Sequence, residues 1–260
     1  RNAGQCDRAR RASLIIANLT DTKDAEVMSE ALRVGIAGLG TVGASVARVL
    51  TDKAAELTRQ CGRPVTVTAV SARSKGRDRG VDLSDAAWFD DPVDMARNAD
   101  IDVFIELIGG DEGPARDSVQ AALENGRHVV TANKALLAKH GLALAAIAEE
   151  KGVLLNYEAA VAGGIPVLKT MRESMAGNTV TRIFGILNGT CNYILTRMEA
   201  EGISFEDCLV DAQRLGYAEA DPTFDIEGND TAHKLSILTS LAFGTEIAAD
   251  DIYLEGISNI

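Results

Sequence analysis

The chain has 260 residues, 46% of them hydrophobic, and a formal net charge of −12. This length allows about two domains with ordinary cores, and the composition excludes a fibrous or disordered protein. The negative charge, with no cluster of Lys or Arg, excludes nucleic acid and anionic membrane as main partners, and no apolar run is long enough to span a bilayer. The expected partner is therefore a small molecule.

The cysteines and the first residues bear on the compartment and on the start of the fold. Cys6, Cys61, Cys191 and Cys208 show no CxxC or zinc-like spacing, which favours reduced thiols in a cytoplasmic protein. Residues 1–27 have no periodic pattern, and Met28 stands just before a strong strand. We expect 1–27 to be an extension outside the fold, and its acidic residues count against a mitochondrial presequence.

The first predicted strand leads into a glycine pattern. Leu32–Ala37 is apolar and is followed by GLGTVG and an amphipathic helix, which is the order of the dinucleotide-binding fingerprint. Glycines allow a tight turn, a close approach of the backbone to the pyrophosphate, and packing of the helix on the strand. The alternative is a tight turn without a ligand. The expected cofactor contacts are Gly38, Gly40, Thr41, Val42 and Gly43, and the residues expected to face inward are Val42, Val46 and Val49 or Leu50.

The second predicted strand, Val65–Ala72, ends where a site that prefers NAD often presents an acidic residue to the ribose. Here the chain has Arg73, Ser74 and Lys75 instead, and these cations suit a 2′-phosphate. We therefore expect NADP(H) to be used at least as well as NAD(H). The alternative is that Arg73 and Lys75 are solvated loop residues.

Further strands and helices alternate along the chain. Asp102–Ile108 predicts a buried strand that closes on Gly109 and Gly110, at a carboxyl end that lines the cofactor crevice of parallel sheets. Thr131 and Lys134 follow another short strand at the same kind of position; Lys134 is either a site residue or an exposed residue behind an Asn133 cap. The remaining predicted elements here are a helix over Pro114–Asn125, strands over Arg127–Val130 and Val153–Tyr157, and a helix after Lys134.

The crossing that follows, Glu158–Gly164, contains two glycines and is a plausible hinge or linker. Pro166 suits the first position of a helix that places Val167, Met171 and Met175 on one face. Ile183–Asn188 has strand character, and the turn Asn188-Gly-Thr190 precedes a helix over Cys191–Met198. This turn either exposes backbone donors to a substrate or only provides Thr190 as a cap.

The stretch Gly216–Lys234 combines carboxylates, a histidine and a lysine in a turn and a helix start. Ser204 opens the helix before it, and Gly216 ends that helix. Asp230 and Lys234 are four residues apart, so on a helix the carboxylate can orient the ammonium for proton transfer. The alternative is a helix cap and a solvated surface pair.

Six separated stretches together resemble homoserine dehydrogenase: VGIAGLGTVG, ELIGG, VVTANK, NYEAAVAGGIPV, GILNGTCNYIL and GYAEADPTFDIEGNDTAHKLSIL. The resemblance runs from about Leu32 to Ile260. It implies an α/β protein, with a Rossmann-type doubly wound parallel sheet over 28–157 and an α+β substrate and dimerisation domain over 158–260. It also implies NAD(P)-dependent interconversion of L-homoserine and L-aspartate 4-semialdehyde, in the biosynthesis of threonine, methionine and isoleucine, by a homodimer or homotetramer.

The resemblance also implies roles for single residues. Lys234 would donate the proton to the aldehyde oxygen, Asp230 would orient it, and Lys134 would join cofactor and substrate and share in catalysis. Glu219 and Asp221 would bind the substrate. A monovalent cation, sodium, would be held by the Glu158 carboxylate and the backbone carbonyls of Val161, Gly163 and Ile165.

One departure from the family pattern stands out. The family's chain normally returns to complete the cofactor domain, and this return segment is missing here.

Two other interpretations compete with the dehydrogenase. One is a related two-domain reductase that acts on a different amino-acid-derived carbonyl compound. The other is a cofactor-sensing protein without catalysis, which would not need the acid and base residues that this sequence contains.

Overall fold

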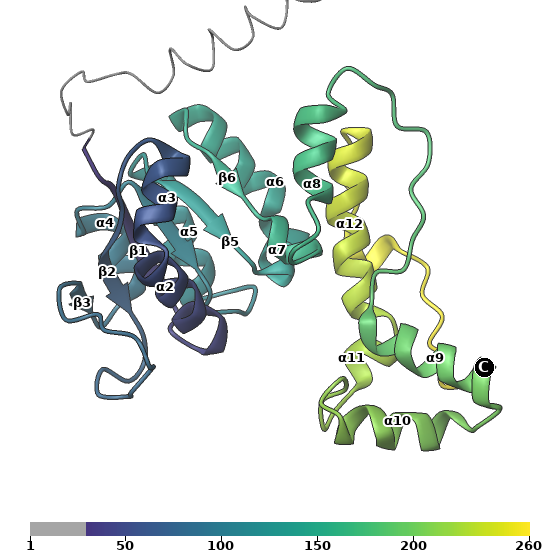
Figure 1. Cartoon of the computed structure of the whole chain (residues 1–260). Helices are drawn as coiled ribbons and strands as arrows, with labels where there is room; N and C mark the ends of the chain where they lie inside the picture. Colours follow the sequence, from purple (N-terminus) through teal and green to yellow (C-terminus); the bar gives the residue numbers. More distant parts are fainter. Residues whose placement is uncertain (1–29) are drawn as a thin grey trace, which may run out of the picture.

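The computed structural model describes residues 30–260, so the expectation that 1–27 lie outside the fold concerns residues that are not described. Figure 1 shows a sheet with helices on both sides and a second group of helices, linked through α7. The elements of the sheet part are β1 (Leu32–Ala37), α2 (Thr41–Asp52), α3 (Ala54–Cys61), β2 (Val65–Ser71), β3 (Ala87–Phe89), α4 (Pro92–Asn98), β4 (Val103–Glu106), α5 (Pro114–Glu124), β5 (His128–Thr131), α6 (Lys134–Lys151) and β6 (Leu155–Asn156).

The sheet has six strands in the order β3-β2-β1-β4-β5-β6, and all neighbouring strands are parallel. The chain moves outward from β1 to β3 and then returns to β4 on the other side of β1. The strand order therefore reverses between β1 and β4, and ligands bind such sheets at the carboxyl ends of the strands beside this point. The predicted α/β class with a Rossmann-type sheet is confirmed.

Helix α2 packs on the sheet through its small residues. Gly43, Ala44 and Ala47 are buried, whereas Val42 and Val49 are exposed, so the predicted inward direction of Val42 is wrong, and of the alternatives Val49 and Leu50 it is Leu50 that faces inward. Val46 and Leu50 do pack against the core. Small side chains let the helix axis approach the strand closely. The buried face of α2 is therefore the one that carries the small residues, and not the one that carries Val42 and Val49.

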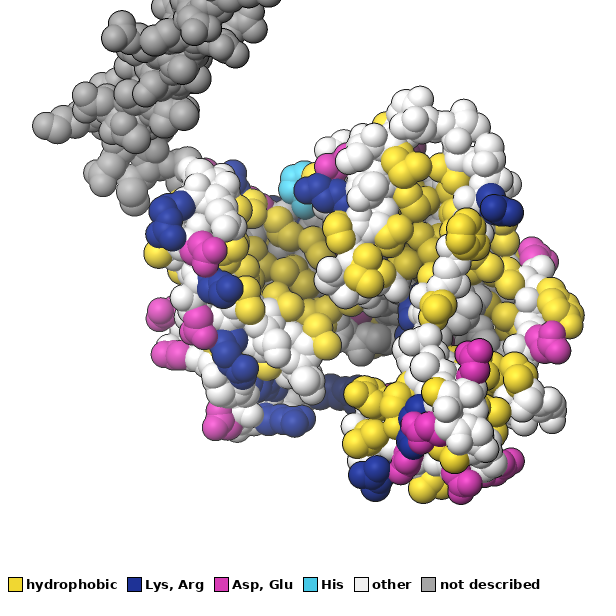
Figure 2. Space-filling view, turned by 45° about the vertical axis from the view of Figure 1, so that its right-hand side comes forward, with side chains coloured by type: hydrophobic (Ala, Val, Ile, Leu, Met, Phe, Trp, Pro, Cys, Tyr) yellow, Lys and Arg dark blue, Asp and Glu magenta, His cyan; other side chains and the backbone are white. Residues whose placement is uncertain are grey.

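The second part contains helices that pack around α12 (Asn229–Phe243), which also contacts α6 of the sheet part. None of the helices within residues 30–260 is long and apolar enough to cross a membrane. Figure 2 shows hydrophobic side chains on both sides of the hollow between the two parts. The other elements are α7 (Glu158–Val161), α8 (Val167–Lys169), the π-helical η1 (Thr170–Ser174), α9 (Gly189–Glu201), α10 (Phe205–Arg214), α11 (Thr223–Ile226) and the 3-10 helix η2 (Ala249–Asp251).

The strand predicted over Ile183–Asn188 is not formed. The segment is irregular, with Phe184 and Ile186 exposed while Ile183 and Leu187 pack against the core. A strand needs backbone partners, and within residues 30–260 no other strand lies alongside this segment. The strand character of Ile183–Asn188 therefore did not produce a strand.

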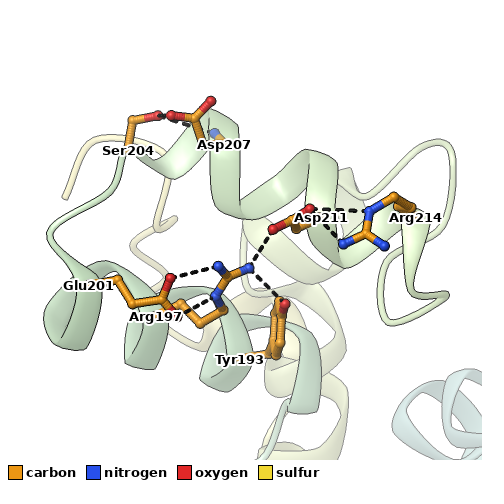
Figure 3. A network of polar contacts seen from close by, with 7 residues as sticks. All are labelled: Tyr193, Arg197, Glu201, Ser204, Asp207, Asp211 and Arg214. Carbon is orange, nitrogen blue, oxygen red and sulfur yellow. Dashed lines mark hydrogen bonds and ion pairs between the residues drawn. The ribbon is translucent and has the colours of Figure 1, made fainter.

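A network of polar contacts joins α9 to α10 (Figure 3). Arg197 of α9 donates to Asp211 of α10 at 2.6 Å, to Glu201 at 2.7 and 2.8 Å, and to the Tyr193 hydroxyl at 3.0 Å. Asp211 also pairs with Arg214, one turn further along α10, at 3.0 Å. The network fastens the two helices together near the surface, and it lies apart from the candidate site described next.

Candidate active site

The glycine-rich turn after β1 requires residues without a side chain at two positions. Gly38 has a φ of +95°, and a Cβ there would lie 2.3 Å from the carbonyl oxygen of Leu107. A Cβ on Gly43 would lie 1.8 Å from the carbonyl oxygen of Gly38, so α2 can begin here only with glycine. A Cβ on Gly40 would meet nothing within 4 Å, which leaves free space beside the backbone at the start of α2.

This free space suits the pyrophosphate of a dinucleotide. Thr41 is the first residue of α2, Gly40 is its N-cap, and no side chain in the described part of the chain caps this end. The first N–H groups of a helix have no partner within the helix, and the helix dipole favours an anion there. Gly40 and Thr41, two of the residues predicted to contact the cofactor, therefore lie at a helix end that suits an anion.

A buried carboxyl group shapes the loop that faces the glycine-rich turn. Glu106, the last residue of β4, is fully buried and accepts hydrogen bonds from the backbone N–H groups of Ile108 at 2.7 Å and Gly109 at 3.0 Å. Its other oxygen accepts from the Thr131 hydroxyl at 2.5 Å, which ties this loop to the end of β5. Glu106 thus places Gly109 and Thr131, both predicted cofactor residues, at one edge of the sheet.

Asn133 connects the same loop to α6. Its side-chain amide donates to the carbonyl oxygen of Gly110 at 2.6 Å, and its side-chain oxygen caps α6 by accepting from the N–H of Leu136 at 3.1 Å. Lys134, the first residue of α6, is therefore held at a defined place beside the cofactor loop. The predicted Asn133 cap is confirmed, and Lys134 is partly buried, with 35% of its side chain exposed.

The loop after β2 carries the predicted 2′-phosphate residues Arg73, Ser74 and Lys75, all exposed to solvent. Arg79 fastens this loop to the glycine-rich turn: it donates to the carbonyl oxygens of Ser74 at 2.5 Å and Leu39 at 3.3 Å. A cavity of about 370 Å³ lies on this loop, lined by residues that include Lys75, Arg79 and Trp88. The loop that carries the predicted cations is therefore joined to the glycine-rich turn through Arg79.

The centre of the candidate site is one buried carboxylate that is shared by two lysines. Asp230, on the first turn of α12, accepts from Lys234 at 2.6 Å and from Lys134 at 3.1 Å, one lysine on each oxygen. Lys234 also donates to the carbonyl oxygen of Leu187 at 2.8 Å. The side chain of Lys234 is 18% exposed and that of Lys134 is 35% exposed, so both ammonium groups still reach the surface of the site.

The charge state of Asp230 follows from its surroundings. Burial raises the pKa of Asp230, but hydrogen bonds from Lys234, Asn188 and Lys134 outweigh burial and hold the pKa below its usual range. Asp230 is therefore an anion at neutral pH and keeps both lysines in place. The structure thus brings together Lys134, Asp230 and Lys234, all three of the predicted catalytic residues, in one cluster.

Three polar residues that the sequence interpretation did not include among the site residues complete this cluster. Asn188 donates to Asp230 and to Asp225, both at 2.9 Å, and also caps α9. Thr190 donates to Asp225 at 3.1 Å and to the carbonyl oxygen of Tyr217 at 2.7 Å, so Asn188 and not Thr190 is the helix cap. The high density of carboxylates in Gly216–Lys234 was the one signal that pointed to Asp225.

The two predicted substrate residues lie outside this cluster. Glu219 is exposed, and Asp221 accepts from the N–H of Thr223 at 3.1 Å at the start of α11. Among residues 30–260, no hydrogen bond or ion pair joins either side chain to the two lysines. Glu219 is thus free to contact a bound molecule, whereas Asp221 holds a turn.

The bend from Glu158 to Ile165 carries the predicted cation ligands. Both oxygens of Glu158 accept backbone hydrogen bonds, from Leu168 at 2.9 Å and Lys169 at 2.8 Å, and the carbonyl oxygen of Ile165 accepts from Val167 at 2.8 Å. Within residues 30–260, no three His, Cys, Asp or Glu side chains gather as a metal site. A carboxylate or carbonyl oxygen has more than one lone pair, so these oxygens still suit a hard monovalent cation.

Comparison with known proteins decides the family. A family model described as the NAD binding domain of homoserine dehydrogenase matches residues 38–158, and one described as homoserine dehydrogenase matches residues 166–260. A solved Archaeoglobus fulgidus structure, assigned provisionally to the same family, is 37% identical, with a TM-score of 0.76 and coverage of 88% of this chain and 73% of that one. The chain belongs to the homoserine dehydrogenase family.

Other members of the family are closer in sequence. Homoserine dehydrogenases from Pseudomonas aeruginosa and Neisseria gonorrhoeae are 51% and 48% identical over 231 and 229 residues, 88% of this chain and 52% of theirs. A homoserine dehydrogenase structure from Thiobacillus denitrificans has a TM-score of 0.82 and 47% identity over 89% of this chain and 53% of that one. This chain therefore spans about half the length of the curated relatives it matches.

Proposed function

We propose that this chain carries the catalytic residues of a dehydrogenase that interconverts L-homoserine and L-aspartate 4-semialdehyde with NADP(H) or NAD(H). The observation that carries the proposal is the shared carboxylate: Asp230 holds Lys134 from the sheet part and Lys234 from the helical part in one site. A nucleotide-binding edge and a proton-transfer group thus meet at the same place. The biosynthetic role in threonine, methionine and isoleucine supply follows from that reaction.

In this proposal Lys234 is the general acid. When bound, the nicotinamide supplies or accepts the hydride at the carbonyl carbon. Lys234 uses two of its three N–H groups on Asp230 and Leu187, which leaves a third N–H that would donate to the substrate oxygen. In reduction it gives a proton to that oxygen, and in oxidation the resulting amine accepts the hydroxyl proton. The ammonium also stabilises the alkoxide that develops as the hydride moves.

Asp230 and Lys134 complete the proposed site. Asp230 keeps Lys234 in its direction and charge state, and Lys134, on the sheet side, contacts both cofactor and substrate. The substrate's amino group is a cation, so the free carboxylate of Glu219 suits it, whereas Asp221 supports the turn that carries Glu219. The carboxylate of the substrate would neutralise part of the positive charge of the two lysines.

For the cofactor we propose that the glycine-rich turn, Gly109, Thr131 and Lys134 hold the dinucleotide, and that Arg73, Ser74 and Lys75 meet a 2′-phosphate. A structure titled as a hyperthermophilic archaeal homoserine dehydrogenase in complex with NADPH is 26% identical to this chain, with a TM-score of 0.73, which supports this choice. Equal or better steady-state efficiency with NAD would contradict the preference for NADP.

We also propose a sodium ion at the bend, held by Glu158 and the backbone carbonyls of Val161, Gly163 and Ile165, where it would stiffen the link between the two parts. Ligand binding to the folded state alone raises the melting temperature, by about 3–6 °C at a tenfold excess over the dissociation constant. Sodium should produce this rise, choline at the same ionic strength should not, and Glu158→Ala should abolish the difference. An equal response to both cations would contradict the site.

Association into a homodimer or homotetramer is a further part of the proposal. Its support is the exposed apolar side chains of the irregular segment before α9, including Phe184 and Ile186, since exposed apolar patches mark interaction surfaces. Sedimentation velocity of the purified chain would test this. A single monomeric species at micromolar concentration would contradict it.

The deciding experiment is the homoserine-dependent reduction of NADP and of NAD by the purified chain, followed by nicotinamide absorbance. We expect a signal that depends on homoserine and is larger with NADP. Activity with another amino-acid-derived semialdehyde but none with homoserine would favour the related reductase instead. Nucleotide binding without turnover on any such substrate would favour a cofactor-sensing protein.

A further inference from the structure

Phe224 lies beside the candidate site and contacts Lys134, which belongs to the sheet part of the molecule. It belongs to α11, yet its ring faces Lys134 at the start of α6, with the ammonium nitrogen 5.7 Å from the ring centroid. This distance is within the range of a cation–π contact, in which the negative face of the ring attracts the ammonium. Phe224 and Asp230 thus approach the same ammonium group.

The ring is held in place by its neighbours on both sides. Before it, the N–H of Thr223 is bound by Asp221. After it, Asp225 accepts from Asn188 and Thr190 on the end of α9. The backbone on either side of Phe224 is therefore fixed to the second part of the molecule, although 44% of the residue is exposed. A fixed backbone limits the directions that the ring can take.

His233 supports the ring from another side. The two rings meet edge to face, with centroids 5.3 Å apart and an angle of 75° between their planes. Burial, and then the nearby charge of Lys134, lower the pKa of His233, so this ring is neutral at pH 7 and does not repel the ammonium. His233 therefore backs Phe224 without competing for Lys134.

We propose that Phe224 is a positioning residue that holds the Lys134 ammonium in the direction required by cofactor and substrate. The inference rests on the proposed function, in which Lys134 contacts both molecules. Asp230 fixes the distance of that ammonium through one oxygen, and a single ion pair leaves the lysine chain free to rotate about it. The ring face supplies the second constraint on the direction of Lys134.

The test compares three variants of the full chain with the parent. Phe224→Leu removes the ring and keeps an apolar side chain, and Phe224→Tyr restores an aromatic face. Phe243→Leu is the matched control, because Phe243 is 43% exposed, lies at the other end of α12 and makes no ring contact with a cation among residues 30–260. Melting temperatures of all three show whether each variant is folded.

The first measurement is the NMR signal of the Lys134 ε-methylene group, assigned with Lys134→Arg in lysine-labelled protein. A group above an aromatic face is shifted to high field, so we expect this shift in the parent, in Phe224→Tyr and in Phe243→Leu, and its loss in Phe224→Leu. An unshifted Lys134 signal in the parent would overturn the contact. This measurement does not depend on activity, so it decides the position of the ammonium even if homoserine is not a substrate.

The second measurement separates KM from kcat. Removal of the ring should raise KM for homoserine about fivefold, because a contact of this kind contributes a few-fold in binding, while kcat changes less than about twofold. Phe224→Tyr should restore the parental KM, and Phe243→Leu should not alter it. An unchanged KM in Phe224→Leu, or no rescue by tyrosine, would overturn the positioning role; no homoserine-dependent activity in the parent would instead overturn the proposed function.

Discussion

Two aspartates of this protein each hold two cations, and their surroundings differ. Asp230 is bound by Lys134 and Lys234 and its side chain is 6% exposed, whereas Asp211 is bound by Arg197 and Arg214 and its side chain is 32% exposed (Figure 3). In both, the paired cations lower the pKa of the carboxyl group, against the opposing effect of burial. This comparison predicts that burial, more than the chemical type of the pair, sets how much an ion pair contributes to stability.

The reason lies in solvent and in chain connectivity. Water and salt screen the charges around Asp211, and its partners are only 3 and 14 residues away, so the pair forms within two neighbouring helices. Asp230 is desolvated and pairs with Lys134 across 96 residues of chain, so the loss of either partner leaves a charge that water cannot fully compensate. Four predictions test this contrast, from the largest expected effect to the smallest.

The largest effect is expected for catalysis. Lys234→Ala removes the proposed general acid and should lower turnover by roughly 10²–10⁴-fold, with nucleotide affinity nearly unchanged. Arg214→Ala, which removes a cation from the exposed aspartate, should leave turnover within about twofold. Homoserine-dependent NADP reduction and a nucleotide titration measure the two quantities. Unchanged turnover in Lys234→Ala would remove this lysine from the mechanism.

The next effect concerns stability. Asp230→Ala leaves two ammonium groups and the Asn188 amide without their shared partner and should lower the free energy of unfolding by about 3 kcal/mol. Asp211→Ala removes pairs that are closer to solvent and should lower it by clearly less. Urea unfolding followed by circular dichroism compares the two variants, and equal losses would show that burial does not separate these aspartates.

A smaller effect is expected from acid. The pKa of Asp230 is lower in the folded protein than in the unfolded chain, where it is near 3.9, so its contribution to stability is complete above that pH and is lost as the pH falls through the folded value. The stability difference between the parent and Asp230→Ala should therefore shrink between pH 5 and the acid limit of folding. A difference that grows toward low pH would mean that the folded pKa is raised.

The smallest effect is expected from salt. Raising KCl from about 0.1 to 1 M should reduce the stability difference between the parent and Asp211→Ala, because pairs close to solvent are screened. The difference for Asp230→Ala should change less. The same urea titrations at two salt concentrations measure this, and an equal salt response at both sites would place Asp230 in contact with bulk solvent.

Much of the fold could be predicted because it depends on local patterns. The strand Leu32–Ala37 was predicted with its observed bounds, and the glycine pattern after it has the expected steric role at Gly38 and Gly43. The ion pair of Asp230 and Lys234 also follows from local spacing, since residues four apart meet on a helix. Where one turn of chain brings two groups together, the sequence is sufficient.

The rest depends on contacts between distant residues. The meeting of Lys134 with Asp230 was implied by family resemblance only, and the roles of Glu106 and Phe224 had no local signal. For Asn188 the sequence indicated only a turn that could expose backbone donors. Glu106 stands in an apolar strand, where nothing in the sequence shows that its partners are the following loop and Thr131. The segment Ile183–Asn188 failed as a predicted strand for the same reason, because a strand depends on a partner elsewhere in the chain.

The glycine-rich turn has a consequence for tolerance to substitution. At position 43 any side chain would collide with the carbonyl oxygen of Gly38, so variants there should be lost in a screen for folded protein. At position 40 a methyl group meets nothing within 4 Å and the backbone φ is −73°, so Gly40→Ala should survive the same screen. Two glycines of one motif are thus needed for different reasons. Gly43 is required by the packing of the chain on itself, whereas the proposed reason for Gly40 is the space that it leaves for a bound cofactor.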